Sequence, residues 1–398
     1  MAEFISEEQH HAEVAALNHE IYRLTKHINE TEKERAEAET PDPYDPFDNP
    51  TEYREFRDNY SEVLPPITTP AYKVPLEPGY DERRRLKRYY AIGGWCAVLQ
   101  FVASTAAGFF IARAIIMILK DMNPGADSES MYTYIKGSSI LVGMNMLIYI
   151  FANVVFAMIG LKLADIKPSA LIKTRDYDVG KAIQYCASAM FIWVISAFVS
   201  MGVNDIFEKY GYSTNVLESE GVAVTKLGFA VSAVYTCVIA PVTEELFFRG
   251  MLLRTFSKAN QRFAVFATAV FFGLAHGNLP QFTLAFLLGI FLAHITLKHG
   301  SIIPSVVVHV FVNTVVTIMG EFDLSGDSQL AVGLILEGVA AFGALMLLIF
   351  RSKDKLPATT PAQSKRGFVI ARCSVGVIAA FTIQAAYTIY LVFTNITS

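Results

Sequence analysis

The sequence predicts an all-α protein: a polytopic bundle of eight or nine transmembrane helices that follows a cytoplasmic N-terminal helix and a linker. Of its 398 residues, 53% are hydrophobic and only 18% are charged, which is too apolar for an ordinary soluble protein. The charged residues are concentrated in residues 1–90, whereas the rest of the chain consists of apolar runs separated by short polar segments. Residues 1–40 are polar and resemble no secretory signal peptide, so we expect internal spans to hold the chain in the bilayer.

Residues 1–40 are predicted to form an amphipathic helix in the cytoplasm. Glu, Ala and Lys are frequent in residues 6–38, and Pro and Gly are absent there. Apolar residues recur at alternating spacings of three and four, like the seam of a coiled coil: Val14, Leu17, Ile21, Leu24 and Ile28. The seam covers about two heptads. It therefore indicates either a short coiled coil that self-associates through residues 14–28 or a solvated helix.

Residues 41–89 are predicted to form an extended linker. Nine prolines and many acidic residues lie between positions 41 and 80, a composition that has little apolar surface to bury. The linker ends in a basic stretch directly before the first apolar run: Arg83, Arg84, Arg85, Lys87 and Arg88. By the positive-inside rule, this stretch places the N-terminal region in the cytoplasm.

Residues 90–396 are predicted to be the transmembrane domain. Nine apolar runs approach the length of a membrane span: 90–119, 137–161, 181–203, 226–256, 262–278, 280–298, 301–320, 329–350 and 367–394. Threaded alternately from a cytoplasmic start, they put Lys and Arg in the inner loops and acidic residues in two outer loops. Run 262–278 is short, so we expect eight or nine spans. The lipid bilayer is thus the expected surrounding, with a bacterial cell membrane favoured over the endoplasmic reticulum. The net charge of −4 does not favour nucleic acid as a partner.

Two adjacent carboxylates and an arginine lie inside the fourth apolar run, in the segment APVTEELFFRG at residues 240–250. Glu245 and Arg249 are four residues apart, so on a helix they share a face and can form an ion pair. Glu244 points about 100° away from that face and lacks a partner on its own helix. Because an unpaired carboxylate in a membrane is costly, Glu244 is a candidate functional residue.

Three further polar residues lie in later apolar runs: His276 in FFGLAHGN, and His309 and Asn313 in HVFVNT. The spacing of His309 and Asn313 puts them on one helix face. At 1.5 Å per residue, the depths below the cytoplasmic end of each run are about 15 Å for Glu244, 21 Å for His276, 12 Å for His309 and 18 Å for Asn313. We therefore expect the four side chains to converge at a middle depth of the bilayer.

A glutamate, two histidines and an asparagine can hydrolyse a peptide bond in two ways. They can bind one divalent metal ion, with zinc expected, which activates a water molecule. Alternatively, Glu244 acts directly as general base on a water, while His309 and Asn313 donate hydrogen bonds to the developing oxyanion. The chain contains no H-E-x-x-H motif, so a zincin-like site is not supported.

The set TEELFFRG, FFGLAHGN and HVFVNT, in that order, resembles the CPBP family of type II CAAX prenyl endopeptidases and bacteriocin-processing (Abi) membrane proteins. The resemblance places a catalytic core at residues 226–320 and implies a metallo- or glutamate-type endopeptidase that cleaves a peptide or protein at the membrane. The roles carried over by position are a water-activating pair, transition-state stabilisers and a supporting pair: Glu244 with His276, His309 with Asn313, and Glu245 with Arg249. If a metal is used, its ligands are expected among Glu244, His276, His309 and Asn313.

Two other functions use the same features. A non-proteolytic scaffold could sequester a partner protein through the N-terminal helix, but it would not need unpaired Glu and His inside the membrane. A proton-coupled transporter could use Glu and His as a proton relay. The absence of a visible internal repeat disfavours the transporter. Proteolysis is therefore the preferred prediction.

Overall fold

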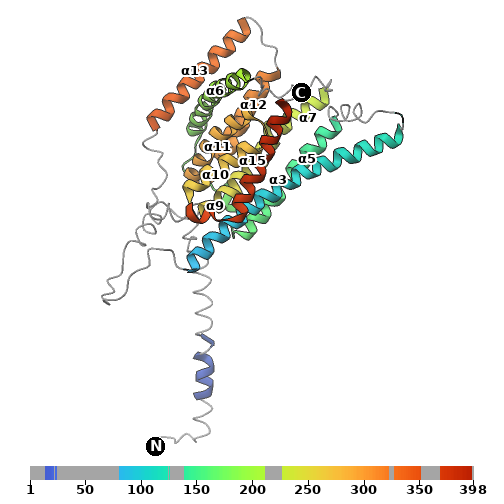
Figure 1. Cartoon of the computed structure of the whole chain (residues 1–398). Coiled ribbons are helices and arrows are strands. Elements are labelled where there is room, and N and C mark those ends of the chain that lie inside the picture. The colour runs from blue at the N-terminus through green and yellow to red at the C-terminus, as the bar shows by residue number, and fades with distance from the viewer. Residues whose placement is uncertain are drawn as a thin grey trace, which may run out of the picture.

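The computed structural model describes residues 14–21, 23–24, 80–123, 125, 139–210, 226–321, 327–350 and 368–396. Within these ranges every regular element is a helix, which confirms the predicted all-α class (Figure 1). The elements are α3 (Tyr80–Met122), α5 (Ser139–Leu163), η1 (Pro168–Ile172), α6 (Val179–Lys209), α7 (Lys226–Val234), η2 (Tyr235–Ile239), α8 (Ala240–Glu245), η3 (Leu246–Leu253), α9 (Arg254–Ser257), α10 (Gln261–Leu274), α11 (Leu279–His299), α12 (Ile303–Glu321), α13 (Asp327–Phe350) and α15 (Val375–Ile396).

Seven helices in the described ranges are long and apolar enough to cross a membrane, so the protein is a multi-pass integral membrane protein. They span Leu86–Met122, Gly143–Leu163, Val179–Lys209, Phe229–Ser257, Leu279–His299, Ala331–Leu348 and Val375–Val392. Two shorter apolar helices, Gln261–Leu274 and Ile303–Met319, account for the remaining two of the nine predicted runs. Run 262–278, expected to be short, is the shortest because its helix ends at Leu274.

Only part of the N-terminal region lies within the described residues. Residues 14–21 and 23–24 are helical there, and the seam side chains Val14, Leu17, Ile21 and Leu24 are exposed. Ile28 and the predicted linker up to residue 79 lie outside the described residues. The division into helix, linker and membrane domain, and self-association through the seam, therefore stay predictions.

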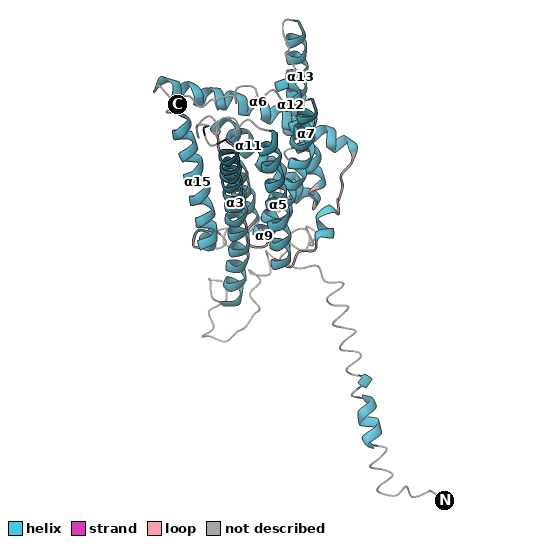
Figure 2. Cartoon of the chain, turned by 90° about the vertical axis from the view of Figure 1, so that its right-hand side faces the viewer, coloured by secondary structure: helices cyan, strands magenta, loops and turns pink. Residues whose placement is uncertain are grey.

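The helices of the membrane domain pack mainly along their antiparallel neighbours. Figure 2 shows α15, α3 and α5 side by side, and α3 contacts both of the others. The α10–α11 hairpin packs beside η3, which follows the glutamate-bearing helix α8. On the other side of the bundle, α13 lies along α6 (Figure 1).

Close approach of α13 to α6 depends on Gly343. Small residues let membrane helices approach closely. Here the helices are so close that a Cβ atom at Gly343 would collide with the backbone of Ala187 and Ser188. We expect Gly343→Val to lower the free energy of unfolding by about 1–3 kcal/mol, the usual cost of overpacking. Thermal unfolding in detergent measures this loss. Gly338→Val is the matched control, because a Cβ at Gly338 on the same helix meets nothing within 4 Å. Equal midpoints for the two variants would contradict the prediction.

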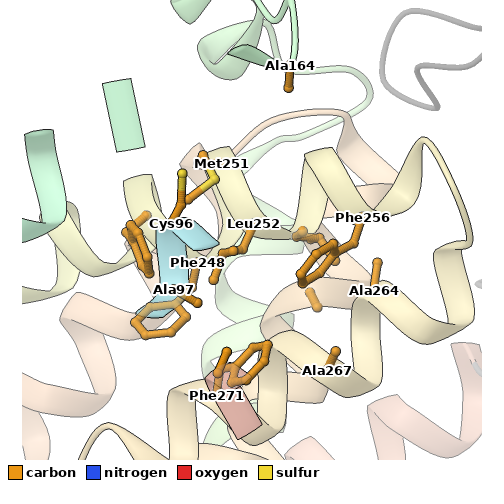
Figure 3. Close-up of a cluster of buried hydrophobic side chains, with 14 of the residues drawn as sticks. Cys96, Ala97, Ala164, Phe248, Met251, Leu252, Phe256, Ala264, Ala267 and Phe271 are labelled. Atoms are coloured by element: carbon orange, nitrogen blue, oxygen red, sulfur yellow. The ribbon is translucent and has the colours of Figure 1, made fainter. Parts of the chain in front are cut away.

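The segment that follows Glu245 is the most enclosed part of the fold. Every residue from Phe247 to Lys258 is buried. Its side chains pack in one apolar cluster with residues of α3 and α10, and Figure 3 shows Phe248, Met251, Leu252 and Phe256 among Cys96, Ala97, Ala264, Ala267 and Phe271. This packing fixes the helix that carries the motif glutamates.

Candidate functional site

The motif glutamates lie on a short α-helical stretch between two π-helical segments. Helix α8 carries both Glu244 and Glu245, with η2 (Tyr235–Ile239) before it and η3 (Leu246–Leu253) after it. The wider π turns change the angular position of the residues beyond them, and such turns occur often at functional sites. The span from α7 to α9 is therefore locally irregular where its charged residues lie.

Glu245 and Arg249 form the ion pair predicted from their spacing. Arg249 Nη1 donates to Glu245 Oε1 at 2.7 Å, and both side chains are fully buried. The guanidinium group also lies 4.4 Å from the centre of the Phe272 ring, and its Nη2 donates to the Gly289 carbonyl at 3.4 Å. The pair thus ties the motif helix to both α10 and α11.

His309 bridges the two glutamates. Its Nδ1 lies 2.9 Å from Glu245 Oε1, and its Nε2 lies 3.8 Å from Glu244 Oε2. Because Glu245 already accepts a hydrogen bond from Arg249, it is an ionised acceptor and His309 Nδ1 is the donor. This bond fixes the ring so that Nε2 is directed toward Glu244.

His276 follows the end of α10. Its Nδ1 lies 2.8 Å from the Phe272 carbonyl, so Nδ1 donates and Nε2 remains as an acceptor. The next residue, Gly277, has a φ of 69°, a conformation that glycine adopts readily. The Asn278 side chain then accepts from the Gln281 amide and caps α11. This tight turn brings His276 into the membrane domain between two helices.

The orientation of Asn313 depends on a proline on another helix. In η2 the Ala240 amide donates to the Tyr235 carbonyl, five residues earlier. The next carbonyl, that of Thr236, would accept in the same pattern from residue 241, which is a proline without an N–H group. Asn313 Nδ2 donates to Thr236 O instead, at 2.9 Å. Pro241 therefore leaves an acceptor that holds the Asn313 amide in place.

All four predicted catalytic side chains line one cavity of about 420 Å³. Glu244, His276 and Asn313 are partly exposed to it, while His309 is 3% exposed. Glu245 and Arg249 are fully buried and do not line the cavity. The arrangement separates a set of groups that can reach a bound molecule from an ion pair that supports them.

Several polar residues of the cavity wall were not expected from the sequence. They come from other helices and include Gln100, Tyr149, Asn153 and Tyr235. Gln100 and Asn153 are carboxamides inside otherwise apolar spans, which is costly in a membrane. A carboxamide inside an apolar span is the sequence feature that could have marked these two residues as functional. They were not predicted because they belong to none of the three motifs.

The donor types around the cavity resemble those of a zinc site. Each histidine uses Nδ1 for a hydrogen bond, which is the usual support of a metal ligand that binds through Nε2. However, no three His, Cys, Asp or Glu side chains in the described residues come together as a metal-binding group. Binding of a divalent metal ion by Glu244, His276, His309 and Asn313 therefore stays a prediction from the sequence.

Comparison with protein families gives a match over the segment that holds the three motifs. Residues 226–315 match the family model described as type II CAAX prenyl endopeptidase Rce1-like. The match covers all three motifs and confirms the resemblance found from them. Comparisons with curated proteins and with solved structures each give no match. The family model supports a protease similar to the CAAX proteases, with a peptide substrate at the membrane.

Proposed function

We propose that the protein is an intramembrane endopeptidase that hydrolyses a peptide bond of a membrane-associated substrate with a water molecule activated by Glu244 and His276. The observation that carries this proposal is the convergence of Glu244, His276, His309 and Asn313 on one cavity within the membrane domain. Residues of three separate apolar runs meet there, and a purely structural role for each of them would not require a shared cavity.

The proposed reaction begins with the transfer of a proton from water to the Glu244 carboxylate. His276 Nε2 accepts a hydrogen bond from the second hydrogen of that water, which stays on the oxygen, and this oxygen bonds to the substrate carbonyl carbon. The resulting tetrahedral intermediate carries a negative oxygen. Glu244 then returns its proton to the amide nitrogen, the C–N bond breaks, and a carboxyl group and an amine leave.

His309 and Asn313 are proposed to stabilise the oxyanion. Asn313 has a second N–H on the Nδ2 that binds Thr236, and this N–H is available to the substrate. For His309 to donate from Nε2 into the cavity while its Nδ1 donates to Glu245, the mechanism requires the imidazolium form. In this form two cations, His309 and Arg249, balance the two carboxylates, so the buried group is neutral as a whole.

We also propose that the N-terminal region is cytoplasmic and that the host membrane is bacterial. Exposed basic residues gather at the end of the bundle where α3 begins: Arg84, Lys87, Arg88, Lys162, Lys167 and Lys173. Arg88 donates to the Leu163 carbonyl at 2.8 Å, which joins the start of α3 to the end of α5. Basic residues at one end of the spans are typical of the cytoplasmic side.

A comparison of peptides from cells that carry the wild type or Glu244→Gln tests the proposed function. We expect new peptide termini that appear only with the wild type, when the two proteins are folded in equal amounts. These termini would identify the substrate as well as the activity. Identical peptide profiles would contradict the proposal and favour a scaffold that sequesters a partner.

A proline on the motif helix is expected to control turnover through Asn313. Pro241→Ala supplies an N–H that can compete for the Thr236 carbonyl and release the Asn313 amide. We expect kcat to fall by about tenfold to a hundredfold, because an oxyanion donor is worth 10²–10³ in kcat when lost completely. KM should stay constant, and the unfolding midpoint should stay constant or rise, because alanine is tolerated in helices.

Steady-state kinetics of the purified variant in lipid check this prediction. Pro304→Ala is the matched control, because Pro304 lies in the first turn of α12, where the N–H group would have no carbonyl partner. Wild-type kcat in Pro241→Ala would show that Asn313 is oriented without the proline.

A further inference from the structure

Two buried carboxamides line the same cavity as Glu244. Gln100 on α3 is 6% exposed, and Asn153 on α5 is 2% exposed. Gln100 Nε2 donates to Asn153 Oδ1 at 2.9 Å. Both residues lie outside the segment that matches the family model. The pair is therefore a polar feature of the cavity that the proposed chemistry leaves without a role.

The pair is connected to the helix of the motif glutamates. Asn153 Nδ2 lies 3.5 Å from Thr243 Oγ1, and Thr243 donates to the Ala240 carbonyl at 3.1 Å. Thr243 directly precedes Glu244 in the chain. These bonds hold the two carboxamides close to the level of Glu244 along α8. A peptide that binds in the cavity with its scissile bond at Glu244 would lie beside them.

Gln100 has hydrogen-bonding capacity that the protein does not use. A carboxamide offers two N–H donors and one oxygen acceptor. In the part of the chain that the structure describes, Gln100 donates one hydrogen bond, and its Oε1 accepts none. A buried polar group usually has a partner, from protein, water or ligand. The cavity is the direction from which such a partner can come.

We propose that the Gln100–Asn153 pair is a subsite that binds the main chain of the peptide substrate beside the scissile bond. A peptide unit carries one N–H and one carbonyl, which is the complement of a carboxamide with a free oxygen and a free N–H. Neutral carboxamides recognise the backbone and do not require a charged substrate side chain. The inference rests on the proposed function and adds to it the means by which an extended peptide is held in register.

The alternative is that the Gln100–Asn153 hydrogen bond has a purely structural role and only joins α3 to α5. Polar side chains do link membrane helices in this way, at an average of about 0.6 kcal/mol. Such a link would not need to line the cavity, and it would not leave Gln100 Oε1 without a partner. The position of the pair in the cavity wall is therefore what distinguishes a subsite from a link.

The test uses the full chain in proteoliposomes and a quenched fluorogenic peptide that ends in a prenylated cysteine and three further residues. Gln100→Leu and Asn153→Leu are each expected to raise KM about tenfold, which corresponds to a hydrogen bond of about 1.4 kcal/mol, with kcat changed less than about twofold. Ser104→Ala is the matched control. Ser104 is buried on α3, bonds within its own helix to the Phe101 carbonyl at 3.0 Å, and does not line the cavity.

A second measurement changes the substrate instead of the protein. Single amides of the peptide next to the scissile bond are replaced by esters, each of which removes one N–H donor. One such ester is expected to raise the wild-type KM about tenfold. The same ester should leave the KM of Gln100→Leu unchanged, because its partner atom is already missing.

The outcomes separate the subsite from the proposed function. If the wild type cleaves the peptide but both leucine variants have the wild-type KM, the subsite alone is overturned. The same holds if no ester changes the KM of the wild type. A loss confined to kcat also overturns it. If the prenylated probe is not cleaved, the peptide found by the Glu244-dependent comparison replaces it. If neither source yields a substrate, the proposed function fails, and the subsite fails with it.

Discussion

Glu244→Gln is expected to lower the rate of peptide hydrolysis by a factor of about 10²–10⁴, the usual contribution of a general base. Glutamine has the same shape but cannot accept the proton of the attacking water. Among the described residues, the contact of Glu244 with a basic side chain is that to His309 Nε2 at 3.8 Å, so the substitution breaks no short ion pair there. The folded yield and the unfolding midpoint should therefore match those of the wild type.

The matched control for this substitution is Glu337→Gln. Glu337 is another glutamate inside a membrane span, but it is exposed on α13 and does not line the cavity. Single-turnover cleavage in lipid should be normal in this control and lost in Glu244→Gln. If both variants cleave at the wild-type rate, Glu244 is not the base and the proposed mechanism is wrong.

Arg249→Met is expected to destabilise the protein by about 3–5 kcal/mol. The substitution removes the guanidinium group that pairs with the fully buried Glu245 carboxylate, and breaking a buried pair in this way costs this much. The loss should appear as a low folded yield and a lowered unfolding midpoint in detergent.

A double variant separates the two roles of this ion pair. In Glu245→Leu/Arg249→Met, apolar side chains replace the whole pair, which is often neutral for stability. We expect the midpoint to recover toward the wild-type value, while activity stays low. Activity stays low because His309 Nδ1 loses the carboxylate that orients its ring. Recovery of both stability and activity would show that Glu245 has no part in positioning His309.

Spacing along single helices accounts for the parts of the site that were predictable. The four-residue step from Glu245 to Arg249 is enough to predict their ion pair. Counting residues from the span ends was enough to expect Glu244, His276, His309 and Asn313 at similar depths, and the four line one cavity. Both inferences depend only on regular helix geometry.

Features that break this regularity, or that join distant helices, could not be predicted. The π turns on either side of α8 change the direction of its side chains, and no residue pattern in APVTEELFFRG signals them. The bond from Asn313 to Thr236 requires both Pro241 and the packing of α12 beside η2. The approach of Gln100 and Asn153 to the cavity depends on how α3 and α5 pack, which their own sequences do not specify.

The shortness of α10 has a consequence for the surrounding lipid. Its 14 residues span about 21 Å, whereas the hydrocarbon core of a typical bilayer is about 30 Å thick. Most of α10 is buried in the bundle, but Arg262 and Phe266 are exposed, and a bilayer that meets the short helix at this face is expected to thin locally. The rate at which water and substrate reach the cavity would thus depend on lipid chain length, so that membrane thickness itself becomes a regulator of the protein.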